Sequence, residues 1–297
     1  MKSALFIAAA TAALAVSAAA APASAADVEI RNAVARVVVI VEDRNDIGVE
    51  ITQGASNLPA VQVRREGRNV RIDGGLRRGG VFGSSDAIRS CNSGPANARQ
   101  PGEGATVNVG GGVGRIRLED APLIVVRSPR DVDLSASGAV YGAIGRGARS
   151  VDLGAGGCGD WTVANVDGKL EVGLGGSGTI RTGTSQELEA SVGGSGSIYA
   201  GATNRLKSSV GGSGNITVAR VDGRGEAAVG GSGGIAIREG QMPRFSVAIG
   251  GSGNVRFGGT TGDLDVSIAG SGNVNVGAAT GQVKRSVVGS GNLNIGR

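Results

Sequence analysis

Carboxylates recur at one position of a repeat, and they are the side chains of this chain best placed to do chemistry. When the copies are aligned on a Gly-Ser-Gly segment, four successive copies carry an acid six residues before the serine: Asp131, Asp152, Glu171 and Glu189. Stacked carboxylates repel one another, so this column could favour a cation or a basic partner. Paired acids at this spacing also resemble the two carboxylates of a glycosidase. The simpler interpretation, which we favour, is an outward-facing ladder screened by water.

Tyrosine and arginine occupy a second position of the repeat, four residues after the serine. The candidate ligand contacts at this position are Tyr141, Arg181, Tyr199 and Arg256. Their place in the alternation points them outward. An exposed stripe of this kind could contact a glycan.

Histidine is absent from the chain, which limits the chemistry further. A Ser-His-Asp or Cys-His nucleophilic site is excluded, and the serines of the repeat have no activating base. Two cysteines without histidine do not make a usual structural zinc site. Gly-rich calcium repeats need an aspartate in every turn, and the matching residue here is neutral. We therefore expect no catalytic residue, no metal and no cofactor, and we predict that the protein is not an enzyme.

The repeat itself must position these columns. Its serine stands at positions 177, 195, 213, 232, 252, 271 and 290, at spacings of 18 to 20 residues. Two degenerate copies precede them, one with Ser137 at the corner and one with Cys158 in place of serine. The total is about nine copies, and a fixed period of this length is typical of stacked repeat architectures.

Strict alternation within each copy predicts β-strands with one buried face. The residues three after the serine are apolar in every copy, for example Ile180, Ile198 and Ile216. We predict an all-β fold, a right-handed parallel β-solenoid of roughly nine coils of 18–21 residues with an N-terminal β cap. Glycines at the corners would supply positive φ and allow close packing. A second column should form a stacked amide ladder: Asn215, Asn254, Asn273 and Asn292.

The chain divides into three parts. Residues 1–25 read as a signal peptide, with Lys2, an Ala-rich apolar stretch and a cleavage site at Ala23-Ser24-Ala25. Residues 26–106 form the β cap, which contains a Gly/Arg-rich insertion at 74–106, and residues 107–297 form the solenoid. We expect export to the periplasm or cell surface, with no transmembrane segment after the signal is removed.

Two further features bear on the partner. Cys91 and Cys158 are the two cysteines, and in an oxidising compartment they could form a disulfide or remain as separate thiols. The net charge is only +5 and aromatic residues make up 2% of the chain. Few aromatics can stack on bases, so we expect no nucleic-acid partner.

The repeated segments resemble a known family. Gly251-Ser252-Gly253-Asn254-Val255, Gly270-Ser271-Gly272-Asn273-Val274 and the entry stretches at 49–54 and 63–72 are similar to the auto-transporter adhesin, head GIN domain family. The resemblance covers most of the chain after the signal and implies a β-solenoid outside the inner membrane, without implying catalytic residues. The insertion at 74–106 departs from the family's pattern.

Three functions stay open at this point. The first is an exported, adhesin-like envelope or surface module that binds a cell-envelope polysaccharide or a protein through a solenoid face. The second is a polysaccharide-cleaving β-helix enzyme that uses the acidic column. The third is a purely structural envelope protein.

Overall fold

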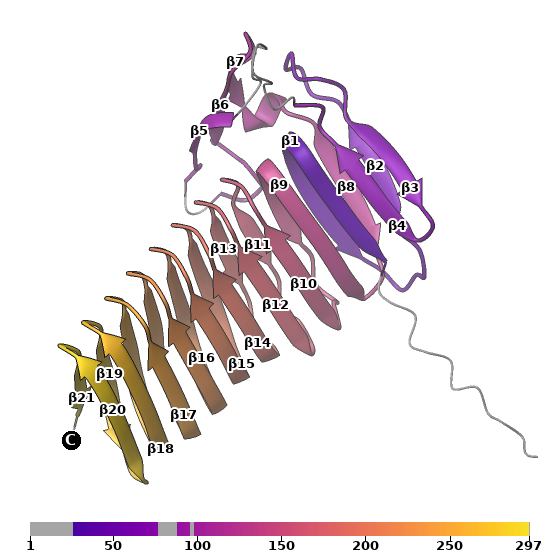
Figure 1. Cartoon of the computed structure of the whole chain (residues 1–297). Helices are drawn as coiled ribbons and strands as arrows, with labels where there is room; N and C mark the ends of the chain where they lie inside the picture. The colour runs from indigo at the N-terminus through magenta and orange to yellow at the C-terminus, as the bar shows by residue number, and fades with distance from the viewer. Residues whose placement is uncertain (1–25, 77–87, 96–97, 297) are drawn as a thin grey trace, which may run out of the picture.

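A computed structural model describes residues 26–76, 88–95 and 98–296, and confirms the predicted fold class. The expected signal peptide lies outside the described residues. The molecule is a β-solenoid of about nine turns with a cap of strands at its N-terminal end (Figure 1). No helix in the described part of the chain is long and apolar enough to span a membrane.

The solenoid is a stack of parallel strands. Each strand pairs in register with its equivalent in the next coil, so that Ile180, Ile198 and Ile216 lie directly above one another. The strands of the stack are β9 (Asp131–Ile144), β10 (Ser150–Ala155), β11 (Trp161–Val163), β12 (Lys169–Leu174), β13 (Thr179–Thr182), β14 (Ser185–Val192), β15 (Ser197–Val210), β16 (Asn215–Val229), β17 (Gly234–Ile249), β18 (Asn254–Gly270), β19 (Asn273–Ala279), β20 (Val283–Gly289) and β21 (Asn292–Ile295).

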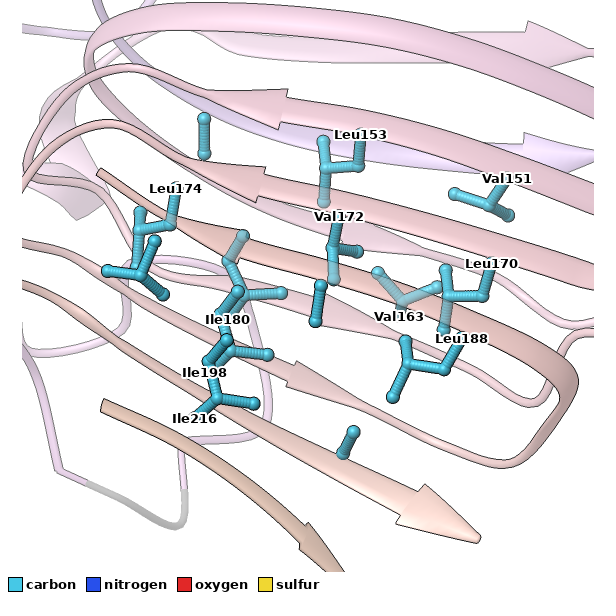
Figure 2. Packing of buried hydrophobic residues seen from close by; sticks show 14 of the residues in the cluster. Val151, Leu153, Val163, Leu170, Val172, Leu174, Ile180, Leu188, Ile198 and Ile216 are labelled. Atoms are coloured by element: carbon cyan, nitrogen blue, oxygen red, sulfur yellow. The ribbon is translucent and has the colours of Figure 1, made fainter. Parts of the chain in front are cut away.

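The interior is filled by continuous columns of aliphatic side chains (Figure 2). Alternation places every second residue inside, and the stacking of coils removes those residues from water. Leu153, Val172 and Ile180 are among the fully buried members. Phe245 and Phe257 pack edge to face inside the later coils, with ring centroids 5.5 Å apart.

The corner glycines are required by the close approach of successive coils. A Cβ built on Gly253 would lie 2.3 Å from the carbonyl oxygen of Gly233 in the coil before, whereas a Cβ on Gly250 in the same corner meets nothing within 4 Å. The expectation of positive φ is wrong for most corners. It holds at Gly270 (φ 147°) and Gly289 (φ 120°).

The amide ladder is present in the later coils. Asn273 donates its side-chain N–H to Asn254 at 3.1 Å, and Asn292 donates to Asn273 at 3.5 Å. Asn215 is separated from this ladder because Gly234 stands between it and Asn254 in the stack. Stacking therefore gives Asn254, Asn273 and Asn292 a structural role, whereas Asn215 lies outside this ladder.

The N-terminal cap continues the stack and then ends it. Strand β1 (Asp27–Val41) pairs in parallel with β9 on one side and with β4 (Asn69–Asp73) and β8 (Leu123–Ser128) on the other. Two antiparallel strands, β2 (Gly48–Thr52) on β8 and β3 (Gln62–Glu66) on β4, complete this end. Antiparallel pairing changes the strand direction, so the parallel ladder does not extend beyond them.

A small sheet lies on the side of the first coils, and only its first strand falls wholly within the predicted insertion at 74–106, so the predicted start of the solenoid at residue 107 is too early. Strands β5 (Ile88–Asn92), β6 (Thr106–Val109) and β7 (Gly114–Arg117) form this sheet, and the short 3₁₀ turn η1 (Leu118–Asp120) follows. Its apolar side chains make a second buried cluster with Val34, Ala139 and Tyr141 on the outer face of β1 and β9.

The alignment of the first degenerate copy on Ser137 is wrong by two residues. Leu134 pairs with Leu153, and Gly142 pairs with Trp161, which places Ala139 at the position of the corner serine. A Cβ on Gly142 would lie 2.2 Å from the Trp161 ring, so a residue without a side chain is needed beneath this indole. The rest of the sequence alignment follows the observed register.

Candidate functional site

The observed register of β9 changes the membership of the acidic column. Asp133, not Asp131, pairs with Asp152, and Asp27 of β1 pairs with Asp133. Asp152, Glu171 and Glu189 follow in register as expected from the sequence. The acidic column of the structure is therefore made of these residues: Asp27, Asp133, Asp152, Glu171 and Glu189.

The acidic column is neutralised at one end only. Lys207, the next residue of the stack, donates to Glu189 at 2.8 Å, and Lys169 donates to Glu171 at 2.7 Å. The hydrogen bond from Lys207 lowers the pKa of Glu189. At the other end, desolvation by burial and then the charges of Asp27 and Asp152 raise the pKa of Asp133.

Asp131 has a different role from the one predicted. Its carboxylate accepts a hydrogen bond from Arg149 Nε at 2.9 Å and from Ser150 Oγ at 2.7 Å. The Arg149 hydrogen bond, with a smaller contribution from Ser150, lowers the pKa of Asp131. Asp131 is an ion-paired residue at the edge of the stack and not a member of the acidic column.

A trough runs beside the acidic column. It has a volume of 480 Å³ and is floored by glycines and serines of successive coils, including Gly154, Gly173 and Ser135. Among the described residues, no three acidic or cysteine side chains are close enough together to hold a metal ion.

The tyrosine and arginine stripe forms an exposed face on another side of the solenoid. The stack brings its members together in register, and we call this set the Arg–Tyr face: Arg181, Tyr199, Thr217, Ala236, Arg256 and Asn275. The Arg181 guanidinium lies 5.5 Å from the centroid of the Tyr199 ring, in cation–π contact. Tyr199 is 43% exposed, so much of its side chain remains available to a ligand.

A groove of 590 Å³ follows the Arg–Tyr face. Tyr199 and Arg256 line it together with Asn215, Asn254 and Asn275. These amide, guanidinium and hydroxyl groups offer both donors and acceptors along one line. Three of the four predicted ligand contacts, Arg181, Tyr199 and Arg256, therefore belong to a single surface.

Tyr141 does not belong to that exposed surface, and its predicted exposure is wrong. Thr162 pairs with Ala143, so Tyr141 lies two residues before the stripe on β9. Its side chain points outward as the alternation requires, but the small sheet covers it and leaves it 1% exposed. The insertion at 74–106 lacks periodicity, so no repeat pattern indicated that a sheet would cover Tyr141.

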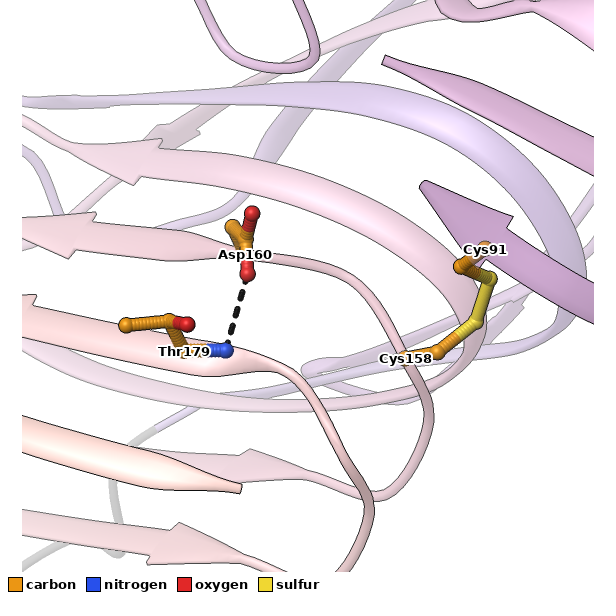
Figure 3. Close-up of a disulfide and its surroundings, with 4 residues drawn as sticks. All are labelled: Cys91, Cys158, Asp160 and Thr179. Atoms are coloured by element: carbon orange, nitrogen blue, oxygen red, sulfur yellow. Dashed lines mark hydrogen bonds between the residues drawn. A yellow bond between two sulfur atoms is a disulfide. The ribbon is translucent and has the colours of Figure 1, made fainter. Parts of the chain in front are cut away.

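A second, smaller pocket lies where the small sheet's connecting loop meets the solenoid. It has a volume of 250 Å³, and we call it the loop pocket. From the solenoid it is lined by Tyr141, Asp160, Thr162, Thr179 and Arg181, and from the loop by residues that include Gln100. Asp160 accepts a hydrogen bond from the Thr179 backbone N–H at 2.8 Å (Figure 3).

Cys91 and Cys158 form a disulfide beside the loop pocket (Figure 3). Their Cα atoms are 6.1 Å apart, in the range usual for a disulfide. The bond joins β5 of the small sheet to the corner of a solenoid coil, where the repeat elsewhere has serine. It therefore holds the covering sheet on the solenoid.

Similarity to known proteins is limited to one shared fold. No family model and no curated protein matches the sequence. Among solved structures, the chain is similar to a Parabacteroides distasonis protein named as a "putative lipid binding protein", with a TM-score of 0.52 and 20% identity over 93% of this chain and 95% of that one. At this identity the similarity shows a shared fold along nearly the whole length of both chains.

Proposed function

We propose that this protein is an exported, non-catalytic, adhesin-like binding module of the cell envelope that holds a glycan along its Arg–Tyr face. The observation that carries the proposal is the line of planar polar groups beside Tyr199 in a groove of 590 Å³. A sugar presents apolar C–H faces to an aromatic ring and hydroxyls to amides and guanidinium groups, which this face supplies together. Export is supported by the Ala-rich N-terminal segment and by the disulfide.

The name of the similar structure makes a lipid the competing ligand. An acyl chain needs an apolar cavity, but the columns inside the described solenoid are closely packed with side chains. Tyr199 is the one large exposed apolar residue at the Arg–Tyr face, and the others in the described part of the chain are Val63, Val283, Val288 and Ile295. A polar polymer suits this surface better than an acyl chain.

The test uses the purified mature chain on an array of peptidoglycan fragments, lipopolysaccharide oligosaccharides and neutral hexose oligomers, with phosphatidylethanolamine–phosphatidylglycerol vesicles as the lipid probe. We expect binding to at least one glycan class, lost in Tyr199→Ala and Arg256→Ala. Arg224→Ala, which removes an exposed arginine that does not line the groove, is the matched control for Arg256→Ala. Binding to the vesicles alone, or glycan binding unchanged in both variants, would refute the proposal.

Polysaccharide cleavage at the acidic column is the second candidate. Its supporting observation is the raised pKa of Asp133 and Asp152, caused first by desolvation, because a general acid must keep its proton. A reducing-end assay on the same glycans tests it. Release of sugar ends that disappears in Asp133→Asn and Asp152→Asn would establish cleavage and contradict the non-catalytic proposal.

A further inference from the structure

Two arginines of the Arg–Tyr face carry charges that the fold does not neutralise. Arg181 contacts the Tyr199 ring, Arg256 lines the groove, and both arginines are exposed. Neither forms an ion pair with a carboxylate in the described part of the chain, whereas Arg205, on the same strand as Tyr199, is paired with Glu187 at 2.7 Å. The described residues that line the groove include no aspartate or glutamate. The face therefore presents two permanent positive charges on an otherwise neutral surface.

The stack fixes the distance between these two charges. Four coil steps separate the two arginines, because the following residues lie in register: Arg181, Tyr199, Thr217, Ala236 and Arg256. At about 4.8 Å per coil, the backbone positions of the two arginines lie about 19 Å apart. One lipid headgroup or one small anion cannot contact both guanidinium groups at that distance. A polymer with acid groups along its length can.

The amide ladder has a gap between the two arginines. Gly234 stands between Asn215 and Asn254 in the stack, and both outward residues of this strand that line the groove, Gly234 and Ala236, are small. The Asn215 side chain makes no hydrogen bond to a described residue, and the Asn254 side chain only accepts one, from Asn273. Both asparagines are exposed, so sugar hydroxyls placed in the gap can use their free amide groups.

We propose that the Arg–Tyr face binds an acidic polysaccharide whose carboxylates pair with Arg181 and Arg256 and whose intervening ring sits in the gap at Gly234. A guanidinium group can hold a carboxylate through two parallel hydrogen bonds. Hydroxyls of the seated ring would bond to Asn215 and Asn254. This inference rests on the proposed function and names the charge class of the glycan.

The preference for an acidic chain depends on both arginines acting together. Each exposed ion pair is screened by salt and contributes little alone. Once one pair has formed on a polymer, the second forms within the same complex and adds to the affinity. We therefore expect an acidic chain to bind about tenfold more tightly than its uncharged counterpart, and this difference to shrink as the salt concentration rises.

The test uses the purified mature chain with fragments of polygalacturonate, polymannuronate and hyaluronan that are long enough to span four coils. Each fragment is compared with its methyl ester, which keeps the sugar backbone and removes the charge. We expect Arg181→Gln and Arg256→Gln each to weaken binding of an acidic fragment by about fivefold to tenfold and to change binding of its ester much less. Arg224→Gln removes the same charge from an exposed position outside the groove and is the matched control.

The gap is tested by filling it. Gly234 does not have positive φ, and a Cβ built on it would lie 3.1 Å from Asn215 Oδ1 and 3.4 Å from the Asn254 carbonyl oxygen. Gly234→Asn should therefore fold with only a small shift of its neighbours, extend the amide ladder and weaken binding of an acidic fragment and its ester alike. Asn215→Ala leaves the backbone unchanged and should also weaken both. Unchanged binding in both variants would overturn the seat at Gly234.

The outcomes separate this inference from the proposed function. Equal binding of acidic and esterified fragments, or binding of neutral array glycans alone, overturns the inference while loss of binding in Tyr199→Ala leaves the proposed function in place. A preference for acidic fragments that falls equally in Arg224→Gln and Arg256→Gln belongs to net charge and also overturns the inference. Binding of no glycan overturns both. A preference that is lost in Arg181→Gln and Arg256→Gln but kept in Arg224→Gln supports the inference.

Discussion

The corner glycines permit a test in which two substitutions in one turn should behave in opposite ways. In Gly253→Ala the new methyl group would lie 2.3 Å from the Gly233 carbonyl oxygen, about 1 Å short of an ordinary contact. The coils must separate there, which weakens the three inter-coil hydrogen bonds from Ser252, Gly253 and Asn254, of 3.2, 3.1 and 3.2 Å. At about 1 kcal/mol each, the expected destabilisation is about 2–3 kcal/mol.

Gly250→Ala is the matched control, because its methyl group would meet nothing within 4 Å and the residue does not have positive φ. Alanine there lowers the entropy of the unfolded chain, so stability should rise by about 0.4–1 kcal/mol or stay unchanged. Urea denaturation followed by far-ultraviolet circular dichroism measures both variants against the wild type. Equal stability of the two alanine variants would refute the explanation of these glycines by close approach of the coils.

Three further predictions concern the cap and the columns. Reduction of the Cys91–Cys158 disulfide, which closes a loop of 67 residues, should lower the free energy of unfolding by about 4 kcal/mol in urea titrations with and without reductant. A double alanine variant that is insensitive to reductant but as stable as the oxidised chain would contradict this. Between pH 10 and 12 the unfolded chain loses the Tyr141 proton while the folded chain keeps it. The wild type should therefore lose up to about 3 kcal/mol more stability than Tyr141→Phe over that range, as measured by the melting temperature across alkaline pH. Parallel curves for the two proteins would argue against burial of the phenol. The pKa of Asp133 is raised in the folded chain, so its ionised carboxylate destabilises the fold. This destabilisation appears as the pH rises from the pKa of Asp133 in the unfolded chain to its pKa in the folded chain. Asp133→Asn should therefore be more stable than the wild type at pH 7 and equally stable in acid, as measured by thermal melts across pH. An equal difference in stability at both pH values would exclude ionisation of Asp133 as its cause.

The core could be predicted from the sequence because it depends on a strictly local pattern. Alternation of apolar residues, as in Ile180, Ile198 and Ile216, fixes which face of every strand is buried. The fixed period then makes equivalent residues neighbours in space, which is why the Arg–Tyr face could be assembled from sequence alone.

The errors arose where contacts are not periodic. Trp161 packs over Gly142, and the register of the first coil lies two residues away from the one that its Ser137-Gly138 pair indicated. Asp27 joined the acidic column from a strand that carries no repeat. The burial of Tyr141 depends on a sheet from a separate part of the chain, which no pattern in the repeat could indicate.

The one-dimensional stack also makes the length of the Arg–Tyr face independent of the cap. The disulfide fixes the small sheet at one end of the solenoid, whereas the length of the face depends on how many coils follow Tyr199. Each coil packs mainly against its neighbours, so coils could be added or lost beyond Asn275 without disturbing the cap. The length of the face would then change in steps of about 4.8 Å per coil, while the cap stays the same.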